Sequence, residues 1–349
     1  MLYNNVYIEG FEAHLPPNII TSSEIEDQLS DVYQKLRLPA GRLEMFSGIK
    51  ERRYWEMGTI PSQVSTQAAQ KIMQRLNIDA SEIDALIHCS VCRDFLEPAT
   101  ASVVHSNLGL PRHAINFDIS NACLGMLTGV GILADMISSG RIKRGLLVAG
   151  EIGYPLLNRT IDHLNNDKSL TRKGIKPHFA SLTIGSAAAA IIVSHEDVVK
   201  NEAHKVISIS DYSYTEHNHL CQGTADSGMG KDSAPLMETD SETLLQKGVE
   251  AAGQCWHKFL EDSKWQHKDL NRCITHQVGS AHSNLLYKTI KIDPSLDFST
   301  FSHIGNCGSA SVPLTVALAN ENKHLIKNDN VALLGIGSGI NCSMISLKW

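Results

Sequence analysis

The 349-residue sequence lacks any apolar run approaching the roughly 18–20 residues that span a bilayer. Its first residues, MLYNNVYIEGFEAHLPP, also lack the basic flank and apolar stretch of a signal peptide. We therefore expect neither a cleaved leader nor a transmembrane anchor. An excess of basic residues is absent too. The 31 Lys and Arg against 37 Asp and Glu give a net charge of −6, which argues against a large nucleic-acid interface.

Several cofactor and hydrolase motifs are also missing. The sequence contains no G-x-x-x-x-G-K-[ST], no G-x-S-x-G and no H-E-x-x-H. The run GIGSG at 335–339 precedes a strand pattern and not a helix, so it is not a dinucleotide fingerprint. Cys89-Ser-Val-Cys92 is a lone C-x-x-C at the end of a predicted strand, which supports neither zinc nor thioredoxin chemistry.

The eight cysteines are scattered through a long chain, unlike the disulfide framework of a short secreted protein. We expect reduced thiols in a cytoplasmic protein, most of them small core residues and at least one a candidate nucleophile. A hydrophobic fraction of 42% supports a large core, and the length allows two domains or one double-sized domain.

Strand and helix patterns alternate along the chain, which is typical of an α/β protein. The predicted strands are 5–10, 83–91, 116–119, 144–150, 185–193, 206–212, 272–275, 301–303, 331–334 and 343–347. The predicted helices are 22–36, 62–76, 99–108, 124–137, 244–260, 280–289 and 310–319. Residues 158–178 are rich in charge with little apolar periodicity and are predicted to be a surface excursion, and 222–235 a loop. The halves suggest two similar lobes, although their sequence identity is too low to establish a duplication.

Cys123 lies where a predicted strand ends and an apolar helix begins. At such a position, backbone N–H groups and the positive end of the helix would stabilise a thiolate, the form that attacks thioester or ester carbonyls. The alternative is a buried structural cysteine, and on position alone both interpretations carry equal weight.

His276 and Asn306 occupy similar positions, each after a predicted strand and before a helix. A histidine can move a proton or donate to an oxyanion, and an asparagine amide can donate to one. Each alone is more simply explained as an ordinary surface or core residue. Together with Cys123 they form a complete set for acyl chemistry.

Glu97 lies in the segment RDFLEP at 93–98. A lone loop glutamate is usually solvated. Its neighbours Phe95, Leu96 and Pro98 could instead desolvate it, which would raise its pKa toward that of a useful base.

These segments carry a resemblance. SNACLG at 120–125, THQ at 275–277 and GNCGSASVP at 305–313 resemble the three active-site segments of the thiolase superfamily, in its 3-oxoacyl-ACP synthase III branch. The spacings are 153 residues from Cys123 to His276 and 30 from His276 to Asn306, and GIGSG resembles the branch's C-terminal glycine loop. The resemblance implies a five-layered α-β-α-β-α thiolase fold with two pseudo-repeated lobes, 1–200 and 201–349, and a homodimer.

Within the branch, VCRDFLEPAT at 91–100 is similar to the OleA enzymes, which join two fatty acyl-CoA molecules head to head into a β-keto acid. Their catalytic glutamate precedes the cysteine, and Glu97 lies 26 residues before Cys123. There is also a departure near the groove for the carrier. Lys50 replaces the Arg of the branch's Gly-Ile-Arg motif, and Phe46 stands where a groove Arg is expected. Either CoA or acyl carrier protein therefore remains open as the carrier.

The resemblance also implies roles for the residues. Cys123 is the nucleophile that forms an acyl-enzyme, and Glu97, reaching in from the partner subunit, is the base that removes a Cα proton from the second thioester. His276 and Asn306 hold the enolate oxygen, while the backbone N–H groups of Cys123 and Gly339 stabilise the tetrahedral intermediate. No metal or redox cofactor is needed.

Two alternatives stay open at this point. The first is a decarboxylating 3-oxoacyl-ACP synthase III, in which a malonyl thioester supplies the carbanion. The second is a non-catalytic thiolase-fold subunit that only pairs with an active partner.

Overall fold

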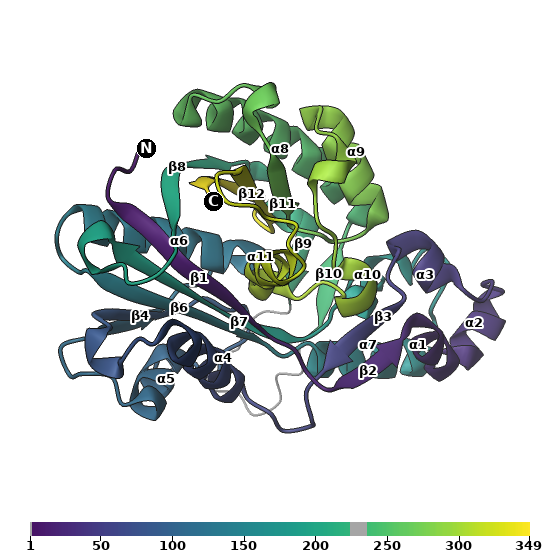
Figure 1. Cartoon of the computed structure of the whole chain (residues 1–349). Coiled ribbons are helices and arrows are strands. Elements are labelled where there is room, and N and C mark those ends of the chain that lie inside the picture. Colours follow the sequence, from purple (N-terminus) through teal and green to yellow (C-terminus); the bar gives the residue numbers. More distant parts are fainter. Residues whose placement is uncertain (1, 224–235) are drawn as a thin grey trace.

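The computed structural model describes residues 2–223 and 236–349. Nine strands form one hydrogen-bonded sheet in the order β11-β12-β13-β8-β1-β7-β6-β4-β5, around which the helices pack (Figure 1). The strands are β1 Val6–His14, β4 Ala85–His88, β5 Ile115–Asp118, β6 Arg144–Glu151, β7 Ala187–His195, β8 His204–Ser213, β11 Arg272–Thr275, β12 Asn330–Gly337 and β13 Asn341–Lys348.

The two halves of this sheet repeat one strand pattern. In the first half β1 pairs antiparallel with β7, β7 antiparallel with β6, and β6 parallel with β4. In the second half β8 pairs antiparallel with β13, β13 antiparallel with β12, and β12 parallel with β11. The halves are joined where β1 pairs with β8, at Tyr7–Lys205 and Ile8–His204, and by the bridges Leu2–Ser208 and Ile184–Asn306. The pseudo-repeat expected from the sequence is therefore present in the topology, while the boundary at residue 200 stays a prediction.

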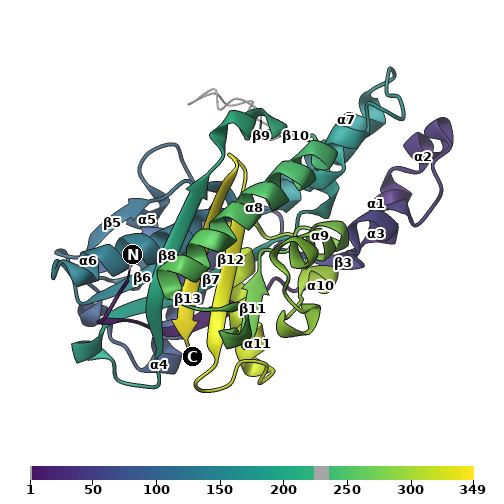
Figure 2. The same ribbon diagram turned by 90° about the horizontal axis from the view of Figure 1, so that it is seen from above.

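The helices form three layers around the two half-sheets. Helices α4 and α5 cover the outer face of the first half, and α8 and α9 the outer face of the second. Helices α6 and α11 lie between the halves, because each contacts strands of both (Figures 1 and 2). These helices are α4 Pro61–Leu76, α5 Thr100–Leu108, α6 Gly125–Ser138, α8 Ser241–Ser263, α9 Ser280–Ile290 and α11 Ser311–Glu321. The five-layered α-β-α-β-α arrangement is confirmed.

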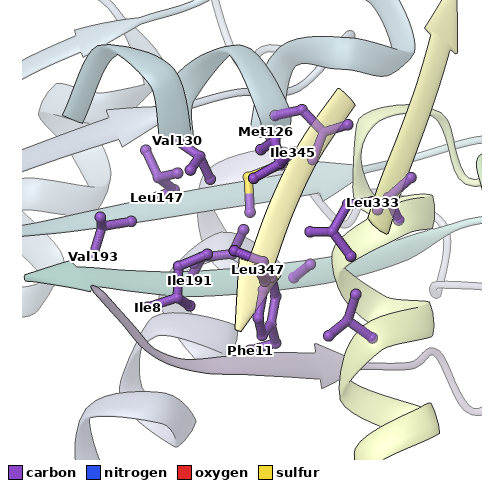
Figure 3. Packing of buried hydrophobic residues seen from close by; sticks show 14 of the residues in the cluster. Ile8, Phe11, Met126, Val130, Leu147, Ile191, Val193, Leu333, Ile345 and Leu347 are labelled. Atoms are coloured by element: carbon purple, nitrogen blue, oxygen red, sulfur yellow. The ribbon is translucent and has the colours of Figure 1, made fainter. Parts of the chain in front are cut away.

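The central layer is held by the largest apolar cluster. Figure 3 shows Met126 and Val130 of α6 facing Ile191 of β7 and Ile345 and Leu347 of β13. Each fully buried aliphatic side chain stabilises the fold by roughly 1.5–3 kcal/mol. Because α6 packs on strands from both halves, nearly every side of it is apolar, as its sequence predicts.

A smaller region projects from one end of the molecule, with its own apolar cluster (Figure 2). It comprises β2 Asn18–Thr21, α1 Ser22–Gln28, α2 Ser30–Leu36, α3 Arg42–Ser47, β3 Glu51–Tyr54 and α7 Tyr154–Asn166. Thr21 caps α1 in a capping box with Glu24, as its sequence suggests, but the predicted helix 22–36 divides at Leu29.

The prediction of an irregular excursion at 158–178 is wrong in its first part, because helix α7 runs to Asn166. Leu157, Ile161 and Leu164 are buried at helical spacing, and the charged residues between them masked this stripe. The predicted strand 301–303 is also wrong, since helix α10, Phe301–Ile304, occupies it.

Most of the predicted loop at 222–235 lies outside the described residues, and beside it β9 Cys221–Gly223 pairs with β10 Met237–Thr239. In the two described stretches we find no helix with the length and apolar character required to cross a membrane.

Candidate active site

Cys123 lies in the turn Ala122–Leu124, between β5 and α6. Asn121 fixes this turn from two sides, donating to Thr128 Oγ1 of α6 at 2.9 Å and accepting from Asn341 Nδ2 of β13 at 3.3 Å. Ala122 has φ +44°, in the left-handed region that costs a non-glycine residue of order 1–3 kcal/mol. The backbone is therefore strained at the residue before Cys123, and the side chain of Cys123 remains partly exposed.

The protonation state of Cys123 differs from the sequence-based expectation of a stabilised thiolate. Desolvation, the Glu151 carboxylate and the Cys221 thiol together raise the pKa of Cys123 to about 12. One N–H of the first turn of the helix is not available to the sulfur. The first-turn N–H of Met126 donates to Ser309 Oγ at 2.9 Å and is thus already satisfied. At neutral pH the Cys123 side chain is therefore in its thiol form.

His276 follows β11 directly, as predicted. Its backbone N–H donates to Leu334 O of β12 at 2.8 Å. On one side, Thr275 is held by hydrogen bonds to Asp297, 2.5 Å from its hydroxyl. On the other, Gln277 donates to Phe298 O at 2.6 Å. The backbone on either side of this histidine is therefore fixed.

The His276 ring is buried, and neither ring nitrogen has a hydrogen-bond partner in the part of the chain that the structure describes. Burial, with a smaller contribution from His282, lowers the pKa of His276 to about 3. The ring is therefore neutral at physiological pH and can donate one N–H to an oxygen atom of a bound molecule.

Asn306 lies in a different local setting from the one predicted, because it follows helix α10 and not a strand. Its backbone pairs with the segment at 183–185, accepting from Gly185 N at 2.9 Å and donating to Thr183 O at 3.1 Å. Its side-chain Oδ1 accepts from Gly308 N at 3.0 Å. Because a backbone N–H can only donate, this bond orients the amide and leaves Nδ2 as the outward donor.

The three segments meet at the end of β12. His276 bonds to Leu334 of this strand, and the turn of Cys123 packs against β12. A Cβ atom on Gly337 would come within 3.4 Å of Cys123 N. The turn Gly308–Ala310, directly after Asn306, contacts the turn of Cys123. Segments whose residues are separated by up to 183 positions in the sequence are thus brought together at the end of β12.

Gly339 belongs to the loop that joins β12 and β13. Its φ is +141°, and a Cβ atom there would lie 2.7 Å from Asn341 Nδ2, so only glycine fits. The neighbouring Ile340 exchanges hydrogen bonds with Tyr214, at 2.8 and 3.2 Å, which hold the loop in place.

Two family models match the chain: the 3-oxoacyl-[acyl-carrier-protein] synthase III model at residues 117–213, and its C-terminal counterpart at 260–349. The acyl-CoA:acyl-CoA alkyltransferase of Shewanella oneidensis is 36% identical, with all of both chains covered. The chain belongs to the 3-oxoacyl-ACP synthase III family.

Further relatives separate two groups within the synthase III family. The acyl-CoA:acyl-CoA alkyltransferase of Xanthomonas campestris is 35% identical over all of both chains. The β-ketoacyl-ACP synthase III of Clostridium tetani is 26% identical over 96% of each. A solved variant of Xanthomonas campestris OleA with bound lauric acid and lauroyl-CoA superposes with a TM-score of 0.93, at 35% identity and with all of both chains covered. The chain is thus a thiolase-fold acyltransferase of the condensing type.

Glu97 of this synthase III chain is exposed, on the loop between β4 and α5. Its neighbours Phe95 and Leu96 are 51% and 50% exposed, so the expected desolvation of Glu97 by them is not found within one protomer. The loop is nevertheless held in place at Asp94, three residues before Glu97. The Asp94 carboxylate accepts from Ser62 N at 2.9 Å, and the Asp94 N–H donates to Thr100 Oγ1 at 3.1 Å.

Phe46 and Lys50, which replace the two arginines expected near the carrier groove, lie on or just after helix α3. The Arg42 guanidinium lies over the exposed ring of Phe46, 4.5 Å from its centroid, on helix α3. Lys50 is exposed a few residues further on. A cation and an aromatic ring are thus paired at the segment where the branch's groove residues are expected.

Glu151 is a site residue that the sequence analysis missed. It ends β6 and is only 4% exposed, yet its carboxylate lies close enough to Cys123 to raise the pKa of that thiol. The available signal was an acidic residue directly after the apolar run LLVAG, at the carboxyl end of a predicted buried strand.

Proposed function

We propose that this protein joins two fatty acyl-CoA molecules by a non-decarboxylative Claisen condensation, through an acyl-enzyme, to give a β-keto acid. The observation that carries this proposal is full-length identity of 36% and 35% to two acyl-CoA:acyl-CoA alkyltransferases. Solved variants of the Xanthomonas OleA replace a glutamate and a cysteine that are 26 positions apart in that chain, the same separation as Glu97 and Cys123.

The first half-reaction loads the enzyme. The Cys123 sulfur attacks the carbonyl of one acyl-CoA, a sulfur–carbon bond forms, and the CoA thiolate leaves and takes up the proton that the Cys123 thiol gives up. The backbone N–H groups of Cys123 and Gly339 stabilise the oxyanion of the tetrahedral intermediate. A pKa of about 12 for Cys123 means that sulfur attack and proton loss are coupled.

The second half-reaction forms the carbon–carbon bond. The Glu97 carboxylate takes a Cα proton from a second acyl-CoA, and the enolate oxygen accepts hydrogen bonds from His276 and from Nδ2 of Asn306. The Cα carbanion attacks the acyl-enzyme carbonyl, and the Cys123 sulfur leaves and regains a proton. Hydrolysis of the resulting β-ketoacyl thioester by water releases CoA and the β-keto acid.

We propose a homodimer in which the loop at 91–98 of one protomer supplies Glu97 to the other. Two features support this arrangement. Strand β5 ends the sheet with all four residues half-buried, so one of its edges is available for pairing. The loop itself exposes Val91, Phe95 and Leu96, an apolar surface that a second copy would cover.

A cytoplasmic location is part of the proposal as well. All eight cysteines are free thiols, which fits a reducing compartment.

A decarboxylating synthase is the second candidate, favoured by the synthase III model matches and by the relative from Clostridium tetani. It differs in needing a malonyl thioester and no carboxylate base. A non-catalytic role as a partner subunit would leave the isolated protein unable to form an acyl-enzyme.

Intact-protein mass spectrometry tests the acyl-enzyme directly. After incubation with lauroyl-CoA, the wild-type chain should gain the mass of one acyl group, and Cys123→Ala should gain none. Cys221→Ala, which removes another partly exposed thiol, is the matched control and should still be acylated. Acylation of Cys123→Ala under the same conditions would place the nucleophile elsewhere.

A further inference from the structure

The Glu151 carboxylate is buried at the carboxyl end of β6 and accepts three backbone hydrogen bonds. Oε1 accepts from Val91 N at 3.0 Å and from Ser309 N at 3.1 Å. Oε2 accepts from Cys92 N at 3.3 Å. A carboxylate that satisfies several backbone donors at once joins the segments to which those donors belong.

These donors come from two segments of the proposed site. Val91 and Cys92 begin the loop that carries Glu97. Ser309 belongs to the turn after Asn306, and a Cβ atom on the neighbouring Gly308 would lie 3.0 Å from Oε1 of Glu151. The carboxylate thus fits closely between the loop and the turn.

A third segment is connected through Ser309. Its backbone N–H donates to Glu151, while its Oγ accepts from Met126 N at 2.9 Å. Met126 lies in the first turn of α6, three residues after Cys123. One residue therefore links Glu151 to the helix that follows the nucleophile.

We propose that Glu151 is a positioning residue: its carboxylate fixes the loop of Glu97 relative to the turn of Asn306 and to the helix of Cys123. This inference deepens the proposed function and rests on it for the roles of these three residues. Glu151 itself is not a catalytic residue, since it acts through the backbone of the segments it holds.

The charge of Glu151 should also affect the ionisation of the Cys123 thiol, which can be measured. The Cys92, Cys123 and Cys307 thiols face the carboxylate, and the Cys221 thiol also faces Cys123. Burial raises the pKa of the Glu151 carboxyl, while its three backbone donors favour the ionised form. After desolvation, the ionised carboxylate is the next cause that raises the pKa of Cys123, because a nearby negative charge disfavours a thiolate. Removal of the charge should therefore make the thiol ionise at lower pH.

Two substitutions separate the effect of the Glu151 charge from the effect of its side-chain length. Glu151→Gln keeps the length but removes the charge, and its amide N–H₂ must face at least one backbone donor. Glu151→Asp keeps the charge but is shorter by one methylene group. Glu9→Gln is the matched control, because Glu9 is an equally buried glutamate at 2% exposure, bonded instead to Arg144 and Ser194.

Two readouts need no assumption about the reaction. The first is hydrogen exchange of the Val91 and Cys92 amides, which should be at least tenfold faster in Glu151→Gln than in wild type. The second is the pH dependence of iodoacetamide labelling at Cys123, whose midpoint should move to lower pH in Glu151→Gln and stay in place in Glu151→Asp. Glu9→Gln should change neither, even if its melting temperature falls.

The third readout is catalytic. Glu151→Gln should still form the acyl-enzyme, while condensation should slow at least tenfold, with Glu151→Asp between it and wild type. Unchanged amide exchange and an unmoved labelling midpoint in Glu151→Gln would overturn the proposal. So would wild-type condensation in that variant. If wild type itself made no β-keto acid, the proposed function would fail, while exchange and labelling would still decide the role of Glu151.

Discussion

At the scale of single residues, the proposed mechanism depends on the charge state of a buried histidine. His276 is neutral because burial lowers its pKa to about 3, so its ring acts as an uncharged donor and not as an imidazolium. The Asn306 amide is oriented by the Gly308 N–H to donate in the same way. Two neutral donors can stabilise an enolate oxygen without presenting a permanent charge to the first substrate.

We therefore expect His276→Ala to acylate Cys123 normally but to slow condensation by roughly 10²–10³, the cost of one oxyanion donor in a well-studied enzyme. Acylation is followed by protein mass and condensation by β-keto acid. His204→Gln, a change at another buried neutral histidine far along the sheet, serves as the control. A variant at His276 that condenses at the wild-type rate would remove this residue from the mechanism.

The candidate residues were predictable from the sequence, but their ionisation was not. Cys123, His276 and Asn306 stand in three recognisable segments. The pKa of Cys123, in contrast, depends on desolvation and on Glu151, and that of His276 on burial and on His282. These contacts exist only after distant segments pack, so no local pattern reports them.

At the scale of elements, helix α6 shows how close packing positions the nucleophile. A Cβ atom on Gly125 would collide with Cys89 O and approach Ser309 Oγ to 2.9 Å. On the same helix, a Cβ atom on Gly131 would meet only Ile209, at an ordinary 3.7 Å. Glycine is thus required by its neighbours at Gly125, but not at Gly131.

Gly125→Ala should destabilise the protein by about 1–3 kcal/mol, because backbone must move to admit the methyl group. Gly131→Ala should instead stabilise it by about 0.5–1 kcal/mol through the better helix propensity of alanine. Urea unfolding of both variants beside wild type measures the difference. Equal stability of the two variants would show that α6 does not pack as described.

Most elements could be predicted from hydrophobic periodicity and capping residues, and two of the errors have separate causes. In α7, charged residues between Leu157, Ile161 and Leu164 hid an amphipathic stripe that packs under the projecting region. In α10, a four-residue helix is too short for its period to be recognised. Its start is held by the distant Gln277, whose Oε1 accepts hydrogen bonds from the N–H groups of Thr300 and Phe301.

At the scale of the whole molecule, the layered architecture buries several histidines in neutral form. Burial lowers the pKa of His88, His204 and His282 to about 4, and that of His276 to about 3. In the unfolded chain each would titrate near 6.5. Between these values the unfolded state binds more protons, so stability falls as pH decreases.

The free energy of unfolding should therefore drop between pH 6.5 and pH 4, by about 1.4 kcal/mol per pH unit for each such histidine. Asp297 opposes this trend over part of the range, because burial raises its pKa to about 6. Burial also raises the pKa of Glu151, and these two carboxyl groups do not offset four histidines. Urea unfolding at pH 7 and pH 5 measures the effect, and His204→Gln should make the dependence shallower. Stability that rises on acidification would contradict these neutral states.

The layering could be anticipated from the alternation of strands and helices and from the resemblance, whereas the join between the halves could not. It consists of a few backbone pairs, between β1 and β8 and at the bridges Leu2–Ser208 and Ile184–Asn306, and no hydrophobic periodicity in the sequence indicates them. The subunit arrangement is likewise beyond the single chain, and it stays a proposal resting on the edge of β5 and the exposed loop at 91–98.

The most direct test of the proposed reaction supplies lauroyl-CoA alone, with no malonyl thioester, and compares wild type with Glu97→Gln. Glu97→Gln keeps the size of the side chain and removes the base that a weakly acidic Cα proton requires. Both proteins should form the acyl-enzyme, but only wild type should release a β-keto acid, or the ketone it yields, that contains both acyl chains. Undiminished product from Glu97→Gln, or product from wild type only after a malonyl thioester is added, would contradict the account.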